Sequence, residues 1–201
     1  MIRDIVSFII IFSSSFINGY SQNPPKKLGL PLGQDTIFLQ GIKTNIVYDL
    51  TSTLNLGAEL QLSKKLSLDI SLNYNPWTFS NNRKLKHFLI QPELRSWLND
   101  SFKGHFLGAH LIYIHYNVGN LPFGSLDDHR YQGDAYGIGF SYGYQWTLSP
   151  IWNIEATLGL GYMYLDYTRY ECETCGSELG KSSKNYIGPT KIGLSLIYIL
   201  K

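Results

Sequence analysis

Charged residues are scarce in this chain. They make up 16% of its 201 residues, against about 25% in an average soluble domain. Their signs nearly cancel, giving a formal net charge of +2, and no basic cluster is large enough to predict nucleic-acid binding. Beyond residue 21 the chain also lacks any apolar run of about 20 residues, the length that a membrane-spanning helix needs. These absences exclude a nucleic-acid-binding protein and a domain that crosses a membrane with helices.

Cysteine is also scarce, because the chain contains only Cys172 and Cys175, in a C-x-x-C arrangement. A structural zinc site normally has four ligands, so zinc would also need histidine, Glu171 or Glu173, or another subunit. A thioredoxin-like redox enzyme would need a βαβ context, which the sequence does not show. Since the N-terminus predicts export, we favour a disulfide that closes a small loop. We expect no metal and no cofactor.

The first 21 residues have the features of a secretory signal peptide. Arg3 gives a basic start, Ile5–Phe12 forms an apolar core, and the small residues Gly19 and Ser21 precede a plausible cleavage point. Serines follow the apolar core and interrupt it too early for a membrane anchor. We therefore predict a signal peptide over residues 1–21.

The rest of the chain divides into a linker and one domain. Residues 22–40 contain three prolines and two glycines, which predicts a periplasmic linker with little regular structure. Residues 41–201 alternate apolar and polar side chains and predict a single domain. Export combined with this alternation predicts the outer membrane of a Gram-negative bacterium as the location.

The clearest alternation lies between Leu54 and Asn75, where every second residue is apolar on either side of a polar break at Ser63–Lys65. Side chains alternate between the two faces of a strand, so this pattern predicts a hairpin with one apolar and one polar face. The polar face is small or acidic and has no lysine, unlike a strand that faces water. We therefore expect the polar face to be enclosed and the apolar face to contact lipid.

The same alternation predicts six further strands, at Ile42–Leu50, His87–Leu98, His105–Asn117, Tyr136–Trp146, Trp152–Tyr164 and Asn185–Leu200. After the first short link, short turns alternate with long loops, which are Pro76–Lys86, Asn117–Asp134 and Tyr167–Lys184. An even strand number with this alternation predicts an all-β fold, an eight-stranded antiparallel up-and-down transmembrane β-barrel. The expected aromatic girdles are Trp146, Trp152 and Tyr198 on the periplasmic side, and Tyr48, Tyr74, Trp77, Tyr136, Tyr164 and Tyr186 on the outer side.

Several stretches resemble a known family: KTNIVYDLTSTLNLGAEL, NYNPWTF, QPELRSWL, GHFLGAH, GYQWTLSPIWNIEATLGLGY, YECETCG and NYIGPTK. Together they resemble the Bacteroides-group family of small outer-membrane β-barrel proteins classed as a domain of unknown function. The resemblance runs from about Gly41 to the C-terminus. It implies an eight-stranded barrel, no established activity, and an association with surface fimbriae.

Charged side chains at inward positions of the predicted strands form the main candidate site. An eight-stranded barrel is just wide enough for its own side chains to fill it, and charges buried there must be paired. We therefore predict an interior salt-bridge network that blocks conduction, rather than a path for protons or ions. Its members are Lys43, Glu59, Asp69, Glu93, Arg95, Glu155 and Lys191.

An enzymatic site would need a base near the outer rim. Candidates are the loop triplet Asp127-Asp128-His129 and His87 at the outer end of a strand, because an aspartate can orient a histidine as a base. Adjacent loop residues seldom face each other, so we expect a solvated loop and no catalytic residues. His110 is expected to be an interior hydrogen-bonding residue rather than a metal ligand.

The leading hypothesis is a non-enzymatic outer-membrane barrel with a filled polar interior. Its expected partners are outer-membrane lipid and a surface or fimbrial protein that the long loops contact. The first rival is a rim-site enzyme that acts on lipid or peptide. The second rival is a soluble, secreted, calycin-like barrel, which would need an apolar inner face to bind an apolar ligand.

Overall fold

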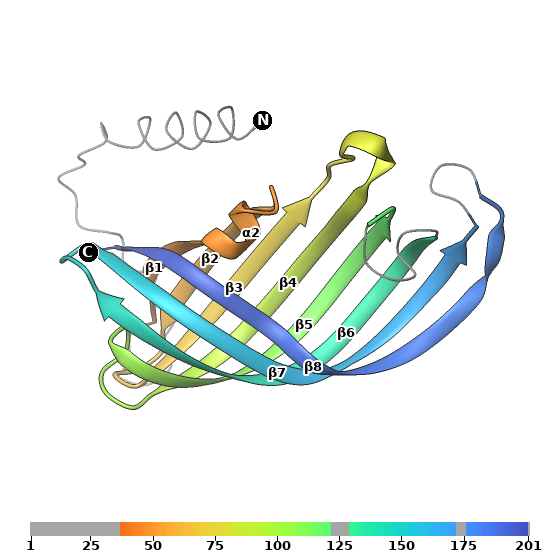
Figure 1. Ribbon diagram of the computed structural model, residues 1–201. Coiled ribbons are helices and arrows are strands. Elements are labelled where there is room, and N and C mark those ends of the chain that lie inside the picture. The colour runs from red at the N-terminus through yellow and green to blue at the C-terminus, as the bar shows by residue number, and fades with distance from the viewer. Residues whose placement is uncertain (1–36, 122–128, 172–175, 201) are drawn as a thin grey trace.

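The computed structural model describes residues 37–121, 129–171 and 176–200, which form eight antiparallel strands in one ring-like sheet (Figure 1). The strands are β1 (Phe38–Asn45), β2 (Leu54–Gln61), β3 (Leu66–Asn75), β4 (Lys84–Trp97), β5 (Gly104–Gly119), β6 (Arg130–Thr147), β7 (Trp152–Tyr170) and β8 (Glu178–Ile199). The helix α2 (Ile46–Asp49) and the 3-10 turn η1 (Ser80–Asn82) are short. The predicted all-β class and the antiparallel order of eight strands are confirmed.

Each strand pairs with its neighbours in sequence, and β1 pairs with β8 to close the ring. This last ladder is short, because it joins only Gly41–Asn45 to Ser195–Ile199. The β7–β8 ladder, in contrast, continues from Trp152 to Tyr170. Among the described residues, no helix is long and apolar enough to cross a membrane.

The strands become longer from β2 to β8 around the ring. The strand β2 has 8 residues and β8 has 22. At about 3.3 Å per residue, the strands on the β8 side continue far past the point where β1–β3 end. Figure 1 shows the later strands, most clearly β7 and β8, extending past the ends of β1–β3 and forming the taller wall of the ring. The rim at this end of the ring is therefore slanted.

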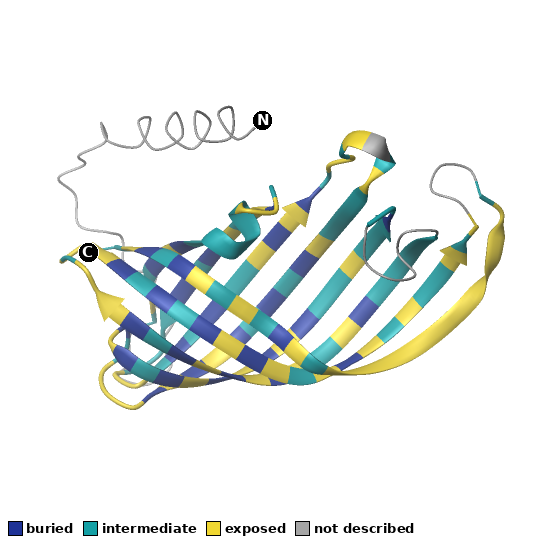
Figure 2. Cartoon of the chain, in the orientation of Figure 1, coloured by how far each residue is buried: buried dark blue, intermediate teal, exposed yellow. Residues whose placement is uncertain are grey.

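Outward and inward faces alternate along most of the sheet, as Figure 2 shows by the stripes of buried and exposed residues, whereas β8 is exposed throughout from Glu178 to Ile187. Large outward side chains are apolar and exposed, among them Leu56, Leu111, Phe140, Leu158 and Leu160. Buried inward residues are mostly polar or charged, among them Lys43, Glu59, Asp69, Glu93, Arg95, His110 and Glu155. The apolar face of this sheet thus points away from the interior of the ring, which inverts the arrangement of a water-soluble protein.

Apolar side chains fill the interior above and below the charged residues. Near the end of the ring where β1 begins and β8 ends, the ring of Trp97 packs 4.8 Å from that of Phe106 and 5.7 Å from that of Phe102. Toward the slanted rim, a buried cluster is formed by Leu89, Ile112, Ala135 and Met163. Trp97 therefore faces inward, as the strict alternation of its strand requires.

The first predicted strand, Ile42–Leu50, is wrong beyond Asn45, where the chain turns into α2. The side-chain Oδ1 of Asn45 accepts a hydrogen bond from the Val47 amide, which is an N-cap that starts the helix. Tyr48, predicted for the outer girdle, instead lines a cavity inside the ring.

The three predicted long loops were also too long, because strands occupy part of each. The strand β4 begins at Lys84 and β5 ends at Gly119. The strand β6 begins at Arg130, and β8 begins at Glu178. In these outer segments the alternation of apolar and polar residues stops, although the backbone ladders continue. The predicted linker, residues 22–40, is also too long at its C-terminal end, since β1 starts at Phe38. The predicted signal peptide, residues 1–21, lies outside the described residues.

Candidate functional site

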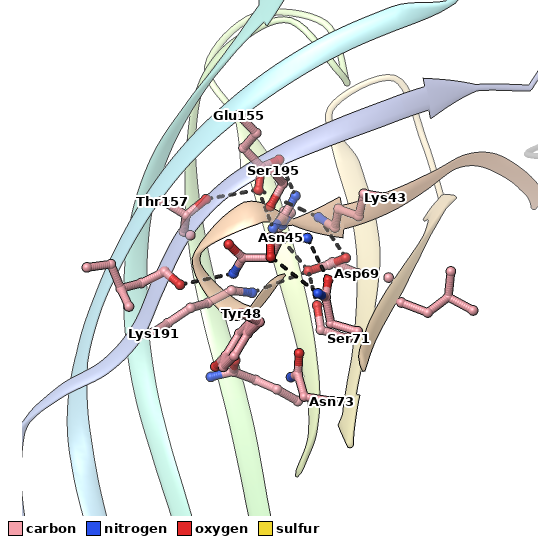
Figure 3. Close-up of a pocket in the computed structure, with 17 residues that line it drawn as sticks. Lys43, Asn45, Tyr48, Asp69, Ser71, Asn73, Glu155, Thr157, Lys191 and Ser195 are labelled. Carbon is pink, nitrogen blue, oxygen red and sulfur yellow. Dashed lines mark hydrogen bonds and ion pairs between the residues drawn. The ribbon is translucent and has the colours of Figure 1, made fainter. Parts of the chain in front are cut away.

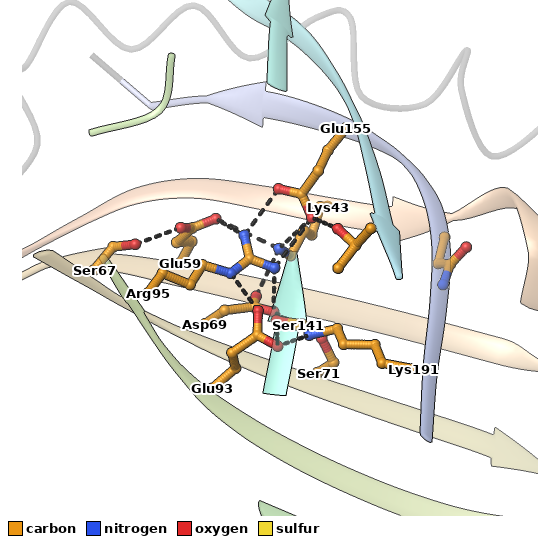
Figure 4. A network of polar contacts seen from close by, with 12 residues as sticks. Lys43, Glu59, Ser67, Asp69, Ser71, Glu93, Arg95, Ser141, Glu155 and Lys191 are labelled. Carbon is orange, nitrogen blue, oxygen red and sulfur yellow. Dashed lines mark hydrogen bonds and ion pairs between the residues drawn. The ribbon is translucent and has the colours of Figure 1, made fainter. Parts of the chain in front are cut away.

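Arg95, on β4, lies at the centre of a charged layer that crosses the ring (Figure 4). Its guanidinium is fully buried. Nε donates to Glu93 Oε1 at 2.7 Å, and Nη2 donates to Asp69 Oδ2 at 3.0 Å. Nη1 donates to Glu59 Oε2 at 2.9 Å and to Glu155 Oε2 at 2.8 Å. One side chain thus ties together carboxylates from β2, β3, β4 and β7.

Two lysines complete the charged layer from the strands on either side of the closing ladder. Lys43 Nζ, on β1, lies 2.8 Å from Asp69 Oδ1 and 3.4 Å from Glu59 Oε2. Lys191 Nζ, on β8, lies 3.1 Å from Glu93 Oε2 and 3.3 Å from Asp69 Oδ2. The structure therefore brings all seven charged residues of the predicted network into one layer.

Hydroxyl groups satisfy the remaining oxygen atoms of the carboxylates. Ser67 donates to Glu59 at 2.6 Å and Ser141 donates to Glu93 at 2.8 Å. Thr157 donates to Glu155 at 2.9 Å. Sequence reasoning did not single out these hydroxyls, although their inward positions follow from the alternation. They limit the cost of burying carboxylates, because each unmet acceptor would oppose folding.

His110 and Phe106 connect the charged layer to the rest of the interior. His110 Nε2 lies 2.9 Å from Thr190 Oγ1, and its Nδ1 lies 3.5 Å from Glu93 Oε2. The β6 chain passes close to this ring, since a Cβ at Gly139 would lie 2.6 Å from His110 Nε2. Below, the Arg95 guanidinium lies 4.4 Å from the centroid of the Phe106 ring, a cation–π contact. His110 thus makes the kind of interior hydrogen bond that was expected of it.

A small cavity lies on the outer side of the charged layer (Figure 3). Its volume is about 30 Å³, room for a water molecule or two. Lys43, Asp69, Lys191 and Tyr48 are among its lining residues, and so is Asn73, whose Nδ2 is buried without a hydrogen-bond partner. The cavity is too small for an organic substrate. The charged layer is therefore better suited to blocking the interior of the ring than to binding a ligand.

The residues proposed for a rim-site enzyme do not form a site in the described part of the chain. His87 Nδ1 lies 2.9 Å from the Leu85 carbonyl oxygen. Asp127 and Asp128 lie outside the described residues. His129 lies with its ring centroid 6.5 Å from that of Tyr131, and no described hydrogen bond joins it to His87.

A histidine and an aspartate that sequence reasoning missed do meet on the outward face. His115 Nδ1, on β5, lies 2.9 Å from Asp134 Oδ1, on β6, and Tyr113 donates to the same oxygen at 2.8 Å. These two hydrogen bonds hold the pKa of Asp134 below its usual range. Within the described residues, no serine, threonine or cysteine is hydrogen-bonded to His115, so a nucleophile is missing. The signal was weak, because the two residues lie far apart in sequence.

Cys172 and Cys175 lie outside the described residues, so their disulfide stays a prediction. Across residues 37–121, 129–171 and 176–200, no three histidine, cysteine, aspartate or glutamate side chains are grouped as a metal site would require.

The fold and the charged layer define a class of protein: an all-β chain whose antiparallel sheet closes into a ring around a filled, ion-paired interior. The chain belongs to the DUF3575 family, described as a protein of unknown function, whose family model matches residues 26–200. The expected membership of a domain-of-unknown-function family is therefore confirmed. No curated protein and no solved structure matches this chain.

Proposed function

We propose that this protein is a non-enzymatic outer-membrane β-barrel, closed to conduction by its charged layer, whose tall outer wall and loops contact a surface or fimbrial protein. The observation that carries the proposal is the continuous outward band of apolar side chains. Phe140 is 73% exposed, Leu160 59% and Leu111 58%. A soluble monomer rarely exposes apolar patches beyond a few hundred Å², whereas a lipid bilayer covers such a band favourably.

Aromatic rows at both edges of the band support a bilayer around the ring. Exposed aromatic side chains at the outer edge are Tyr74, Phe88, Tyr136 and Tyr164, and those at the inner edge are Trp146, Trp152 and Tyr198. Two residues past Tyr136 and Tyr164 on the same face, the outward positions turn polar at Asp134 and Asp166, which pair with each other. This sequence of polar, aromatic, apolar and aromatic rows is typical of barrels that span an outer membrane.

The interior favours a plug over either rival function. A calycin-like carrier would need an apolar chamber, but a layer of paired charges crosses the ring at its centre. A rim-site enzyme would need a nucleophile beside His115, and none is bonded there in the described residues. What remains available for interaction is the wall that rises beyond the band.

The proposal predicts a heat-modifiable protein in the outer-membrane fraction that needs detergent for extraction. Leu158, midway along the β7 part of the band, is 55% exposed. Replacing it with arginine should lower the unfolding free energy in lipid vesicles by about 2–4 kcal/mol, the cost of arginine at the bilayer midplane. Unfolding is followed by gel mobility against urea concentration.

The matched control is Ser183→Arg, on the same outward face of the sheet but beyond the band, on β8. It should change the unfolding free energy by less than about 0.5 kcal/mol, as exposed surface substitutions do. Equal effects of the two arginines, or release of the protein as a soluble periplasmic species, would refute the membrane-spanning barrel.

A further inference from the structure

Among the described residues, the outer part of β8 pairs with one strand only. It pairs with β7 along its length, but with β1 only over Ser195–Ile199. Where β1 stops, the Asn45 side chain takes its place, since Nδ2 donates to the Ile192 carbonyl at 3.1 Å and Oδ1 accepts from the Leu194 amide at 3.2 Å. Past this point, β8 residues from Glu178 to Ile187 are all exposed (Figure 2).

The outer eight residues of this exposed stretch, Glu178–Asn185, form the β8 edge. The unpaired side of an edge strand presents amide and carbonyl groups that another extended chain can pair with. Its outward residues Lys181 and Ser183 are polar, and so are their partners on β7, Thr168 and Asp166, whereas Leu179 is apolar and 43% exposed. The β8 edge therefore lies where water, rather than lipid, would surround it.

Two lysines determine which chain can pair with the β8 edge. Lys181 shares the outward face with Thr168, whereas Lys184 pairs with Leu165 on the concave face. Both side chains are exposed. Within the described residues, neither lies within ion-pair distance of a carboxylate. The edge thus offers one unpaired positive charge on each face of the sheet.

The lysine spacing disfavours a second copy of this chain as the partner. An antiparallel copy related by a two-fold axis pairs residues of the same face, so each Lys181 lies diagonal to its own copy in the register centred on Ser182, and each Lys184 does in the register centred on Ser183. Either register brings like charges within reach of each other across the pair. A strand with two acidic residues three positions apart would instead meet both lysines, because such residues also point to opposite faces.

We propose that the β8 edge binds an extended acidic segment of a partner protein by β-strand addition, with carboxylates opposite Lys181 and Lys184. The proposal deepens the proposed function and rests on it, since it assigns the surface contact to this edge. Backbone hydrogen bonds would supply affinity, and the two lysines would supply selectivity.

The test uses the full chain in detergent micelles, with its folded state verified by gel mobility. The probe is a fluorescent peptide of about ten residues, a common strand length, alternating threonine and valine with two glutamates three positions apart. We expect saturable binding by fluorescence anisotropy. The same peptide with lysines in place of the glutamates should bind far more weakly. N-methylation of alternate backbone amides on its pairing side should abolish binding, because it removes the strand hydrogen bonds while keeping the charges.

The matched variants separate the edge from general electrostatics. Lys181→Glu with Lys184→Glu should weaken glutamate-peptide binding by about tenfold or more, because two attractive pairs become repulsive, and should favour the lysine peptide. Lys64→Glu with Lys65→Glu makes the same charge change in the β2–β3 turn and should leave binding unchanged.

Equal binding of the N-methylated peptide, equal effects of the two charge reversals, or no binding would each overturn the proposal. So would a wild-type chain that is dimeric and whose Ser183→Cys variant forms a crosslinked dimer through that cysteine, since the edge partner would then be a second copy. The membrane test is independent of these outcomes. A soluble protein that still binds the peptide would refute the barrel in lipid and leave the edge site standing.

Discussion

Arg95 holds the interior of the ring together because its three nitrogen atoms reach carboxylates on four strands. In the low-dielectric interior, the guanidinium and its partners depend on each other, since each would be costly to bury alone. Arginine suits this position because its planar fork stays charged and offers five donors. A lysine there could not reach all four carboxylates from one point.

Replacing Arg95 with alanine should lower the unfolding free energy by about 3–5 kcal/mol, the usual cost of removing one member of a buried ion pair. Four carboxylates would then face only Lys43 and Lys191. Urea-dependent gel mobility of the folded form measures the loss. Leu68→Ala, on the outward face of β3, is the control and should cost less. A larger loss for Leu68→Ala would contradict the central role of Arg95.

The charged residues of this layer could be located from the sequence because strand alternation assigns each of them a face. Asp69, for example, lies between two outward leucine or isoleucine positions, so its inward direction follows. The hydroxyl partners Ser67 and Thr157 were equally placed, but a serine or threonine carries no charge that demands a partner. The His115–Asp134 contact could not be found, since it depends on the register between β5 and β6, which turn lengths alone do not fix.

At the scale of elements, Asn45 performs two tasks. It starts α2 by accepting from the Val47 amide, and it bonds to the backbone of β8 where β1 ends. The sequence alternation continued through Ile46 and Tyr48 as though the strand did, because one helical turn is too short to show its own periodicity. A strand and a capped single turn therefore looked alike.

Asn45→Ala should speed hydrogen exchange of the Leu194 amide, because that amide loses its hydrogen-bond acceptor. Asn45→Asp is the matched control, since its carboxylate keeps the acceptor and loses only the donor to Ile192. Exchange is measured by mass spectrometry or NMR on the folded protein. If the aspartate variant exchanges as fast as the alanine variant, the side chain does not pair with β8 in this way.

The strand ends were misjudged for a physical reason that applies to β5–β8 together. Sequence alternation is strong only where one face meets an apolar surface, and it fades where both faces meet water. The backbone ladders of β6 and β7 nevertheless continue to the Arg130–Tyr170 pair. Ladder hydrogen bonds need no particular side chains, so the height of the outer wall was not visible in the sequence.

At the scale of the whole molecule, the charged layer and the aromatic cluster of Trp97 and Phe106 together block the interior of the ring. We expect the purified protein in planar bilayers to show no steady conductance, because the paired side chains of the Arg95 layer fill the ring in the described part of the chain. A water-filled porin in the same bilayer is the positive control. A stable conductance in the wild-type protein that Arg95→Ala raises only slightly would show that the interior is not filled.

The short β1–β8 ladder also has a consequence for how the chain folds. Its two strands come from opposite ends of the domain, so their encounter carries the largest loop-closure cost, and few backbone pairs compensate for it. The long hairpins β5–β6, β6–β7 and β7–β8 join neighbours in sequence and form early. We therefore expect closure to come last, after an open sheet with two bare edges has formed. Such an open sheet would be the most aggregation-prone stage of folding, and a chaperone that covers its edges would act at that stage.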